Sequence, residues 1–419
     1  MPANFGSGKL DAPWLKSGPA GRVLALLNGN GEEARVIGGA VRNALLGIPV
    51  ADIDIATTAL PDEVIRRATE AGIKSVPTGI EHGTVTLVID KHPFEITTLR
   101  EDTETFGRKA KVAFGRDWMR DAERRDFTIN GLSVDAGGVV HDYVGGLADI
   151  AERRVRFIGN AAERIAEDYL RILRFFRIHA AYGAGEPDRA GYLACIGGRA
   201  GLASLSAERV RMEMLKLMVA PGAAGAIVAM ADCGLLQQIV GGVTYAGPLA
   251  AMIEVERLLG LPADAMRRLA ALAVAVTEDA KRVAARLRLS NAEAKALDSM
   301  GHRWWRLAGM DEATARRRLY RLGEEAYRDR LMLAWARAGG GDTASWRPMA
   351  DLPQRWSAPK FPLKAADFIA RGIAEGPALG HVLAIAEDAW LAAGFPLEAS
   401  ALSGIADQTV ARFARDHRL

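Results

Sequence analysis

Two adjacent glycines, Gly38 and Gly39, precede Arg42 where a β-rich run gives way to a helical one. Glycines at a strand-to-helix turn let backbone N–H groups approach an anion closely. An arginine one turn into the helix can grip a phosphate through two hydrogen bonds. By itself such a motif is more often a packing turn, so a phosphate-binding turn is predicted only together with the residues that follow.

Asp52 and Asp54 follow this turn closely, with one residue between them. On a strand, residues two apart point to the same face, so the two carboxylates would converge and repel each other. Mg²⁺ resolves such a conflict because hard divalent cations prefer oxygen ligands. Beside the glycine turn, the pair predicts metal ligands for nucleotidyl transfer rather than a solvated edge strand. Glu95 is either a third carboxylate or a polar position on an edge strand.

Two later clusters add charged groups. Arg125 and Asp126 lie in the run 124–130, just before a predicted strand, and are suited to hold a ribose or a triphosphate. A surface charge run is the alternative. Further along, four charged residues recur every three positions on a predicted helix, so the first three could share one site while the last needs more reach. They are Asp168, Arg171, Arg174 and Arg177. A solvated ladder of salt bridges is the alternative.

The elements that must position these residues differ between the two ends of the chain. Up to residue 149, short β-rich runs alternate with helical segments and turn signals, which predicts a small domain of mixed sheet and helices. Predicted strands cover Ala34–Ile37, Asp52–Ala56, Gly83–Asp90, Phe94–Leu99, Leu132–Val134 and Val139–His141. Predicted helices include Val23–Leu27 within a longer segment, Val41–Leu46 and Pro61–Ala71.

Beyond Asn160 the strand signals end and helical periodicity takes over. A long helix is predicted over Glu163–Ala181, because its apolar residues recur every three or four positions. Further helices are predicted over Ala207–Met218, Ala223–Val243, Leu249–Leu259, Asp264–Leu287, Asn291–Trp305, Asp311–Ala338 and Lys364–Leu391, the last broken at Gly376-Pro377. The run Gly339–Thr343 is the clearest predicted linker.

Composition limits the classes of function. The 419 residues carry 54 Lys+Arg and 51 Asp+Glu, which is too balanced for a polycation, so nucleic-acid contacts must come from local patches. Two cysteines cannot form a disulfide framework or a zinc finger. We expect a cytoplasmic protein, because the first residues lack a secretory signal and the most apolar stretch is interrupted by polar residues.

Four motifs in order resemble the bacterial class II CCA-adding tRNA nucleotidyltransferases and their poly(A) polymerase relatives, within the DNA polymerase β-like superfamily. The glycine turn with its aspartate pair comes first, then Arg124-Arg125-Asp126, then Asp142-Tyr-Val-Gly-Gly, then Glu167-Asp168 with Arg171 and Arg174. The resemblance covers residues 34–215. It implies an α+β fold: a small polymerase-β-like head (1–150), then an extended all-α neck (151–220), body (221–340) and tail (341–419).

The resemblance also implies roles. Gly38, Gly39 and Arg42 would bind nucleotide phosphates, Asp52 and Asp54 two Mg²⁺ ions, Arg125 and Asp126 the ribose and phosphates, Asp168 and Arg171 the base, and Arg174 and Arg177 the rest of the pocket. Asp142 with Gly145-Gly146 would form an architectural turn, and Leu99–Asp121 a flexible loop carrying Arg100, Arg108, Lys109 and Arg116. One residue departs from the family pattern: Asn43 stands where an aspartate is usual.

Hydrogen-bond chemistry supports the base-reading role. A carboxylate accepts and a guanidinium donates, which matches the amine and ring nitrogen that cytosine and adenine present side by side. Uracil and guanine present the reverse pattern and would leave buried groups unpaired. The implied activity is therefore template-independent CCA addition to tRNA from CTP and ATP. A poly(A) polymerase, an enzyme that adds only CC or only A, and an inactive RNA-binding protein are the alternatives.

The predicted RNA contacts lie in the second half of the chain. Arginines in excess there, with two tryptophans among them, would contact tRNA phosphates without reading sequence. They are Arg282, Arg286, Arg288, Arg303, Arg306, Arg316, Arg317, Arg318 and Arg321, with Trp304 and Trp305. Solvated helix faces with core tryptophans are the alternative. Neither a membrane nor a protein partner is implied.

Overall fold

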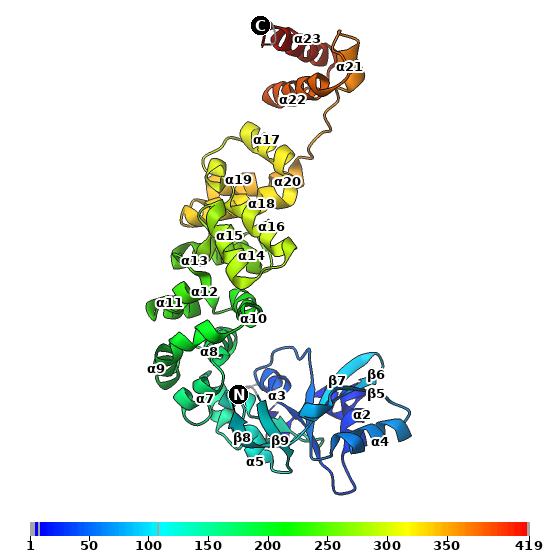
Figure 1. Cartoon of the computed structure of the whole chain (residues 1–419), viewed down its shortest axis with the longest axis vertical. Helices are drawn as coiled ribbons and strands as arrows, with labels where there is room; N and C mark the ends of the chain where they lie inside the picture. Colours follow the sequence, from blue (N-terminus) through cyan, green and yellow to red (C-terminus); the bar gives the residue numbers. More distant parts are fainter. Residues whose placement is uncertain (1–4, 7–8, 107–108, 417–419) are drawn as a thin grey trace. The chain divides into compact units, whose positions relative to one another are not determined.

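The computed structural model describes residues 5–6, 9–106 and 109–416, with side chains for residues 9–100 and 114–416. The chain divides into two compact units, Met1–Gly241 and Gly242–Leu419 (Figure 1). The first unit contains the sheet and the helices that follow it, and the second is helical throughout its described part. The finer division of the chain, at residues 150, 220 and 340, stays a prediction.

A seven-stranded mixed sheet forms the head, in the order β11-β10-β3-β4-β7-β6-β5. Only β4 and β7 run parallel; each other pair of neighbours is antiparallel. The strands are β3 (Ala34–Ile37), β4 (Asp54–Thr57), β5 (Lys74–Gly79), β6 (Thr84–Ile89), β7 (His92–Thr98), β10 (Ser133–Val134) and β11 (Val140–His141). All six predicted strands are confirmed with small shifts of their ends, and β5 was not predicted.

Short helices surround this sheet. They are α1 (Pro13–Lys16), α2 (Gly18–Leu27), α3 (Gly39–Leu45), α4 (Pro61–Glu70), α5 (Trp118–Glu123) and α6 (Gly146–Ala151). Helix α4 begins with Pro61 and ends just before Gly72 at φ +67°, as its sequence predicts. Its buried face, with Val64 and Ala68, packs on β5 and β6. The central strand β3 is buried along its whole length, which fixes the start of the glycine turn.

The predicted flexible loop contains a hairpin of β8 (Arg100–Phe106) and β9 (Lys109–Phe114), which pair only with each other. Arg116, just after β9, donates to both carboxylate oxygens of Glu32 at 2.9 Å. Arg108 and the side chain of Lys109 lie outside the described residues. A second small sheet joins β1 (Phe5–Gly6) and β2 (Lys9–Leu10).

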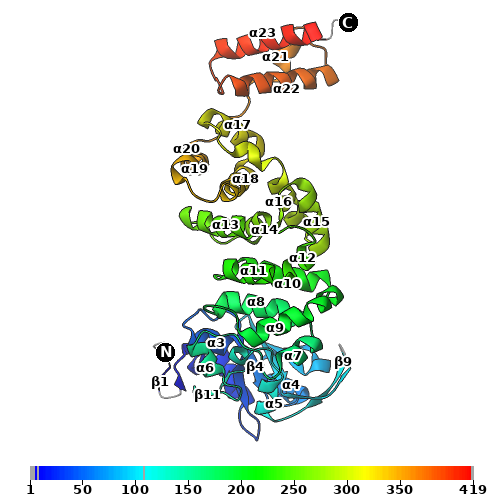
Figure 2. The same cartoon turned by 90° about the vertical axis from the view of Figure 1, so that its left-hand side faces the viewer.

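Further helices complete the first unit. They are α7 (Ala161–Glu167), α8 (Leu170–Tyr182), α9 (Arg189–Gly198), α10 (Ala207–Met218), α11 (Ala223–Asp232) and α12 (Leu235–Val240). Helix α8 packs on α10 and α11 (Figure 2). Three buried aromatic rings connect α8 to the head. The ring centres of Phe127 and Phe157 lie 4.9 Å apart, and the Phe157 ring stacks on that of Phe175 with a centre-to-centre distance of 5.4 Å. Helix α8 is thereby packed against the head.

The second unit contains α13 (Ala246–Leu258), α14 (Ala265–Ala273), α15 (Thr277–Leu287), α16 (Asn291–Gly301), α17 (Glu312–Leu322), α18 (Glu324–Arg337), α19 (Thr343–Ala350), α20 (Leu352–Arg355), α21 (Ala365–Ile369), α22 (Pro377–Ala392) and α23 (Ala399–Asp416). The predicted linker is packed, because the Trp335 indole N–H donates to the Gly341 carbonyl at 2.7 Å. Across the described residues, no helix has the length and apolarity needed to cross a membrane.

Several long predicted helices were wrong as single helices. Two of them are divided at a glycine whose positive φ suits a helix end. The run from 223 to 243 breaks at Gly234 with φ +70°, and the run from 311 to 338 breaks at Gly323 with φ +76°. The run from 264 to 287 breaks around Val276, and the run from 291 to 305 ends at Gly301 before a short 3₁₀ turn. Apolar periodicity continues through such breaks and does not reveal them.

Candidate active site

The glycine turn joins β3 to α3 as predicted. Gly38 has φ +65°, a backbone conformation that side chains rarely adopt. A Cβ on Gly38 would stand 3.3 Å from a terminal nitrogen of Arg125, and one on Gly39 would stand 3.5 Å from a terminal nitrogen of Arg42. The missing side chains therefore leave room beside two guanidinium groups. This is the cradle that a phosphate needs.

Arg42 is buried, with only 7% of its surface exposed. Its Nε and Nη2 donate to Oδ1 of Asn43 at 3.2 and 2.8 Å, and its Nη1 donates to Oδ1 of Asn130 at 2.5 Å. The guanidinium carbon lies 3.7 Å from the centre of the Tyr182 ring. Burial lowers the pKa of Arg42, and the charge of Arg177 lowers it further. The group remains a cation because the unperturbed value is so high.

Asp54 is the first residue of β4, and Asp52 lies just before the strand, so the prediction that both lie on it was wrong. Burial raises the pKa of Asp54, and so do the neighbouring charges of Glu95 and Asp52, while Arg125 lowers it. The parallel register pairs Ile55 with Ile96, which sets Glu95 beside Asp54. Because β7 lies between β4 and β6, the edge-strand explanation of Glu95 was wrong.

This carboxylate set fits a divalent cation in its chemistry. A carboxylate such as Asp54, whose pKa is raised by burial and by the charges of neighbouring carboxylates, is stabilised by a hard cation. No group of three or more acidic, histidine or cysteine side chains within the described residues is placed to hold a metal by itself. Asp52 and Asp54 would therefore share an ion with oxygen ligands from a substrate, as Mg²⁺ sites commonly do.

Arg125 and Asp126 are held by different partners. Arg125 donates to Asp121 at 3.0 Å, and Asp121 also pairs with Arg124 at 2.5 Å. Asp126 accepts from Arg174 through Nε at 2.7 Å and Nη2 at 2.6 Å. Burial alone would raise the pKa of Asp126, but the charge of Arg174 and the hydrogen bonds lower it overall. The head segment is thus fastened to helix α8.

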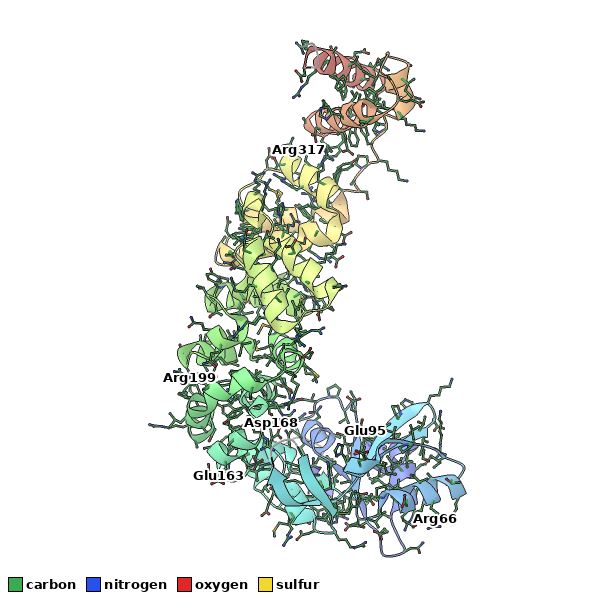
Figure 3. All side chains as sticks on the ribbon, in the orientation of Figure 1. Arg66, Glu95, Glu163, Asp168, Arg199 and Arg317 are labelled. Carbon is green, nitrogen blue, oxygen red and sulfur yellow. The ribbon has the colours of Figure 1, made fainter. Side chains whose placement is uncertain are left out.

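The structure corrects the prediction that Asp168 and Arg171 share one continuous helix. Helix α7 ends at Glu167, Asp168 is extended with φ −155° and ψ 106°, and α8 begins at Leu170. Asp168 accepts from the Leu170 N–H at 3.1 Å and from Arg209 of α10 at 2.6 Å. Figure 3 shows Asp168 at this break and Glu95 in the sheet. Asp168 therefore accepts from the first N–H group of α8 besides facing the cavity.

The remaining guanidiniums also have acidic partners. Arg171 pairs with Glu167 and donates to the Arg164 carbonyl at 2.6 Å. Arg177 pairs with Glu213 of α10, which is 4% exposed. Four of these site contacts involve residues that sequence reasoning missed: Glu167 as a partner, Arg209, Glu213 and Asn130. Of these contacts, only the ion pairs of Glu167 with Arg164 and Arg171 could have been recognised from the sequence, because the three residues are spaced three and four positions apart.

One open cavity of about 510 Å³ collects these groups. Every predicted site residue except Asp52 lines it, together with four that were not predicted. The lining residues are Gly38, Gly39, Arg42, Asp54, Arg125, Asp126, Asn130, Asp168, Leu170, Arg171, Arg174, Arg177, Ile178 and Arg209. Six arginines against three aspartates make the cavity strongly cationic, which suits a polyanionic ligand.

The turn after β11 has the architectural form that was predicted. Asp142 accepts four backbone N–H groups, from Val144, Gly145, Gly146 and Leu147, at 2.8 to 3.1 Å. A Cβ on Gly146 would stand 2.3 Å from the Thr128 carbonyl oxygen, so the close approach of two segments requires glycine there. This turn begins α6. No described hydrogen bond joins it to the residues that line the cavity.

In the second unit, several arginines of the predicted RNA-binding set are already engaged. Arg316 pairs with Glu312 at 2.6 Å, Arg317 donates to Thr314 at 2.8 Å, and Arg321 pairs with Glu387 and Asp388. The three consecutive residues Arg316, Arg317 and Arg318 are referred to below as the α17 arginines. Trp304 donates to the Ala275 carbonyl at 2.8 Å, whereas Trp305 is 47% exposed. Trp304 is therefore partly buried and hydrogen-bonded, and Trp305 is the more exposed of the two.

Comparison with known proteins identifies the class of the head. Residues 34–156 match a family model described as the poly A polymerase head domain, and residues 199–246 match one described as a probable RNA and SrmB-binding site of polymerase A. Both ranges contain cavity residues, Asp54 in the first and Arg209 in the second. The head is thus a nucleotidyltransferase domain of the poly(A) polymerase type.

Individual relatives narrow this class. A mitochondrial CCA tRNA nucleotidyltransferase 1 of Danio rerio is 33% identical over 85% of this chain and 83% of its own. A CCA-adding enzyme of Bacillus stearothermophilus in complex with CTP has 25% identity and a TM-score of 0.69, covering 94% of this chain and 98% of that one. A Thermotoga maritima CCA-adding enzyme complexed with tRNA shares the fold, with 20% identity, a TM-score of 0.70 and coverage of 95% and 97%. The chain belongs to the CCA tRNA nucleotidyltransferase family and is a nucleotidyltransferase.

Proposed function

We propose that the protein adds CCA to the 3′ end of tRNA, using CTP and ATP as substrates and no nucleic-acid template. The observation that carries this proposal is the cationic cavity, in which a carboxylate, Asp168, and a guanidinium, Arg171, lie with the phosphate cradle and Asp54. The names of the relatives support the same reaction.

Each residue of the cavity has a role in this proposal. Gly38, Gly39 and Arg42 bind the phosphates, Arg125 and Asp126 meet the ribose and phosphates, and Arg174 and Arg177 complete the pocket. Asp52 and Asp54 would hold Mg²⁺, which would neutralise phosphate charge and lower the pKa of the attacking 3′-hydroxyl. The residues of the chain align the α-phosphate and the hydroxyl for direct displacement, and positioning supplies most of the rate.

Base selection follows from Asp168 and Arg171. Cytosine and adenine offer an amine to the carboxylate and a ring nitrogen to the guanidinium, whereas uracil and guanine leave both protein groups unpaired. In the structure Arg209 and Glu167 occupy these two groups. The base must therefore share or replace those partners, and the hydrogen bond from the Leu170 N–H keeps Asp168 in place during the exchange.

We propose that the tRNA contacts include the arginines of the second unit, through phosphates rather than bases. A cytoplasmic location is also proposed, supported by Cys195 and Cys233, which are free and buried as is usual in a reducing compartment.

The test uses three RNAs: tRNA lacking CCA, tRNA ending in CC, and an unrelated RNA. Each is incubated with labelled CTP or ATP separately and resolved at single-nucleotide length. We expect CTP to extend the first by CC, ATP to extend the second by A, and the unrelated RNA to stay unlabelled. The Asp54→Asn variant is the control for contaminating activity.

Other outcomes would replace the proposal. Long A tails on the unrelated RNA would identify a poly(A) polymerase. Incorporation of CTP alone or ATP alone, even when both are supplied, would identify an enzyme that adds only part of the sequence. Retained tRNA binding without any Mg²⁺-dependent incorporation would identify an inactive RNA-binding protein.

A further inference from the structure

The arginines of the cavity differ in one respect. Five of the six have a carboxylate partner: Arg125 has Asp121, Arg171 has Glu167, Arg174 has Asp126, Arg177 has Glu213 and Arg209 has Asp168. Arg42 has none among the described residues: its side-chain partners are the amides of Asn43 and Asn130 and the hydroxyl of Tyr182, none of them a carboxylate. Its charge is therefore the one least neutralised by the protein.

Burial makes this absence of a counter-ion significant. Arg42 is 7% exposed, and a buried charge is costly unless an opposite charge offsets it. The charge of the Asp126 carboxylate raises the pKa of Arg42, but two nitrogens of Arg174 already bind that carboxylate at 2.6 and 2.7 Å. The charge of Arg42 is thus left for an anion from outside, and the open face of Gly39 gives that anion access.

Asn43 fixes this arrangement. Its Oδ1 accepts two N–H groups of Arg42, while its Nδ2 donates to the Pro49 carbonyl at 3.3 Å, which orients the amide. An aspartate in this position would accept the same two N–H groups and would neutralise the guanidinium.

We propose that Asn43 is a positioning residue that holds Arg42 without neutralising it, and so raises the affinity of the cavity for the polyphosphate of the nucleotide. This inference rests on the proposed function for the identity of the ligand. It goes beyond that function in assigning the strength of phosphate binding to a neutral side chain. The substitution Asn43→Asp should weaken binding although it adds a favourable contact inside the protein.

The size of the effect follows from Coulomb's law. An added unit charge roughly 6–8 Å from a phosphate, at an effective dielectric constant of about 40, changes the affinity about tenfold. We therefore expect Asn43→Asp to raise the Kd for CTP and for inorganic tripolyphosphate about tenfold. Cytidine has no phosphate, so its own affinity, measured by competition with CTP, should be the same for the wild type and for Asn43→Asp.

The control is Asn160→Asp, which adds the same charge to the same unit at the exposed start of α7. Asn160 caps that helix through its side-chain oxygen, and aspartate is an equally good cap. The full chain is titrated with CTP or tripolyphosphate by calorimetry at fixed ionic strength, without RNA. The unfolding temperature without ligand should be at or above the wild-type value for Asn43→Asp, which separates weaker binding from damage to the fold.

Two results would overturn the inference: equal tripolyphosphate affinity in Asn43→Asp and the wild type, or the same loss in Asn160→Asp. A loss of cytidine competition equal to the loss for CTP would also overturn it, since the effect would then not be electrostatic. If the wild type binds tripolyphosphate more tightly than Asn43→Asp does but binds neither CTP nor ATP, the anion site is supported and the proposed function is contradicted.

Discussion

The ion pair between Asp126 and Arg174 allows the strength of the head-to-neck connection to be measured. Asp126→Asn keeps the size of the side chain but removes the acceptor that faces Nε and Nη2 of Arg174 at 2.7 and 2.6 Å. The amide oxygen can still accept from Phe127 N at 2.9 Å and from Asn130 at 3.0 Å. The substitution therefore isolates the charged half of the interaction.

The expected loss of stability lies between two limits. Breaking one partner of a fully buried ion pair costs about 3–5 kcal/mol, and a hydrogen bond to a charged group contributes about 1.5–3 kcal/mol. The Asp126 side chain is 10% exposed but that of Arg174 is 34% exposed, so water partly compensates the arginine. We expect a loss of about 2–3 kcal/mol. Combining Asp126→Asn with Arg174→Gln should cost less than the sum of the two single substitutions.

The pH dependence gives a second test. The pKa of Asp126 is held below its usual 3.8, because the charge of Arg174 and the hydrogen bonds outweigh the effect of burial. A carboxyl whose pKa is lower in the folded state stabilises the protein above its unfolded pKa and loses this contribution as pH falls through the folded value. The difference between wild type and Asp126→Asn should thus be constant from neutral pH to about pH 5, and should shrink below about pH 4.

Hydrogen exchange of α8 amides in increasing urea measures this stability within the first unit alone. Asp11→Asn is the matched control, because Asp11 pairs with Lys16 at 2.7 Å with both side chains exposed, and it should change stability by less than about 0.5 kcal/mol. A cost for Asp126→Asn as small as that of the control would refute the reasoning. So would a difference that persists unchanged at pH 3.

Three further outcomes are expected. Asp54→Ala should lower the rate of nucleotide addition about a thousandfold, the equivalent of several kcal/mol of lost charge stabilisation. Filter binding should show tRNA affinity near the wild-type value. A kcat comparable to that of the wild type would refute the metal role. Reversing the α17 arginines to Glu should weaken tRNA binding and flatten its salt dependence, and an unchanged slope of log K against log salt would show that they do not contact RNA. Asp168→Ala and Arg171→Ala should each reduce the kcat/KM preference for CTP over UTP about ten- to a hundredfold, and a preference that survives both would show that the base is read elsewhere.

The sequence was sufficient for the local features of the head. The glycine turn, the strands on either side of it and the helix that begins at Pro61 depend on short-range rules for φ angles and apolar alternation. Most of the long helices were predicted in the right places but not their breaks. At Asp168 the break could have been suspected, because aspartate is common just before a helix begins, and here it accepts from the Leu170 N–H. Tyr169, counted as apolar, fits the helical spacing, so a continuous helix was predicted instead.

The tertiary reason for that break could not be predicted. The position where a Cβ of Gly201 would lie is only 2.0 Å from the Tyr169 ring, so the ring packs on bare backbone from a segment 32 residues away. Such contacts are invisible to a periodicity argument, which considers one element at a time. The same limit applies to Glu213 and Arg209, whose separations from their partners in the chain have no characteristic spacing.

The acidic partners explain how a cavity with six arginines remains stable before a nucleotide arrives. Mutual repulsion among the guanidiniums is offset by carboxylates from α5, α7, α10 and the intervening segments, so most of the charge is already compensated. A nucleotide that binds there exchanges one set of ion pairs for another, and the net gain at each exchanged pair is modest. Affinity then depends most on a cation that has no such partner to give up. In this cavity that cation is Arg42, and the neutral amide of Asn43 leaves its charge available.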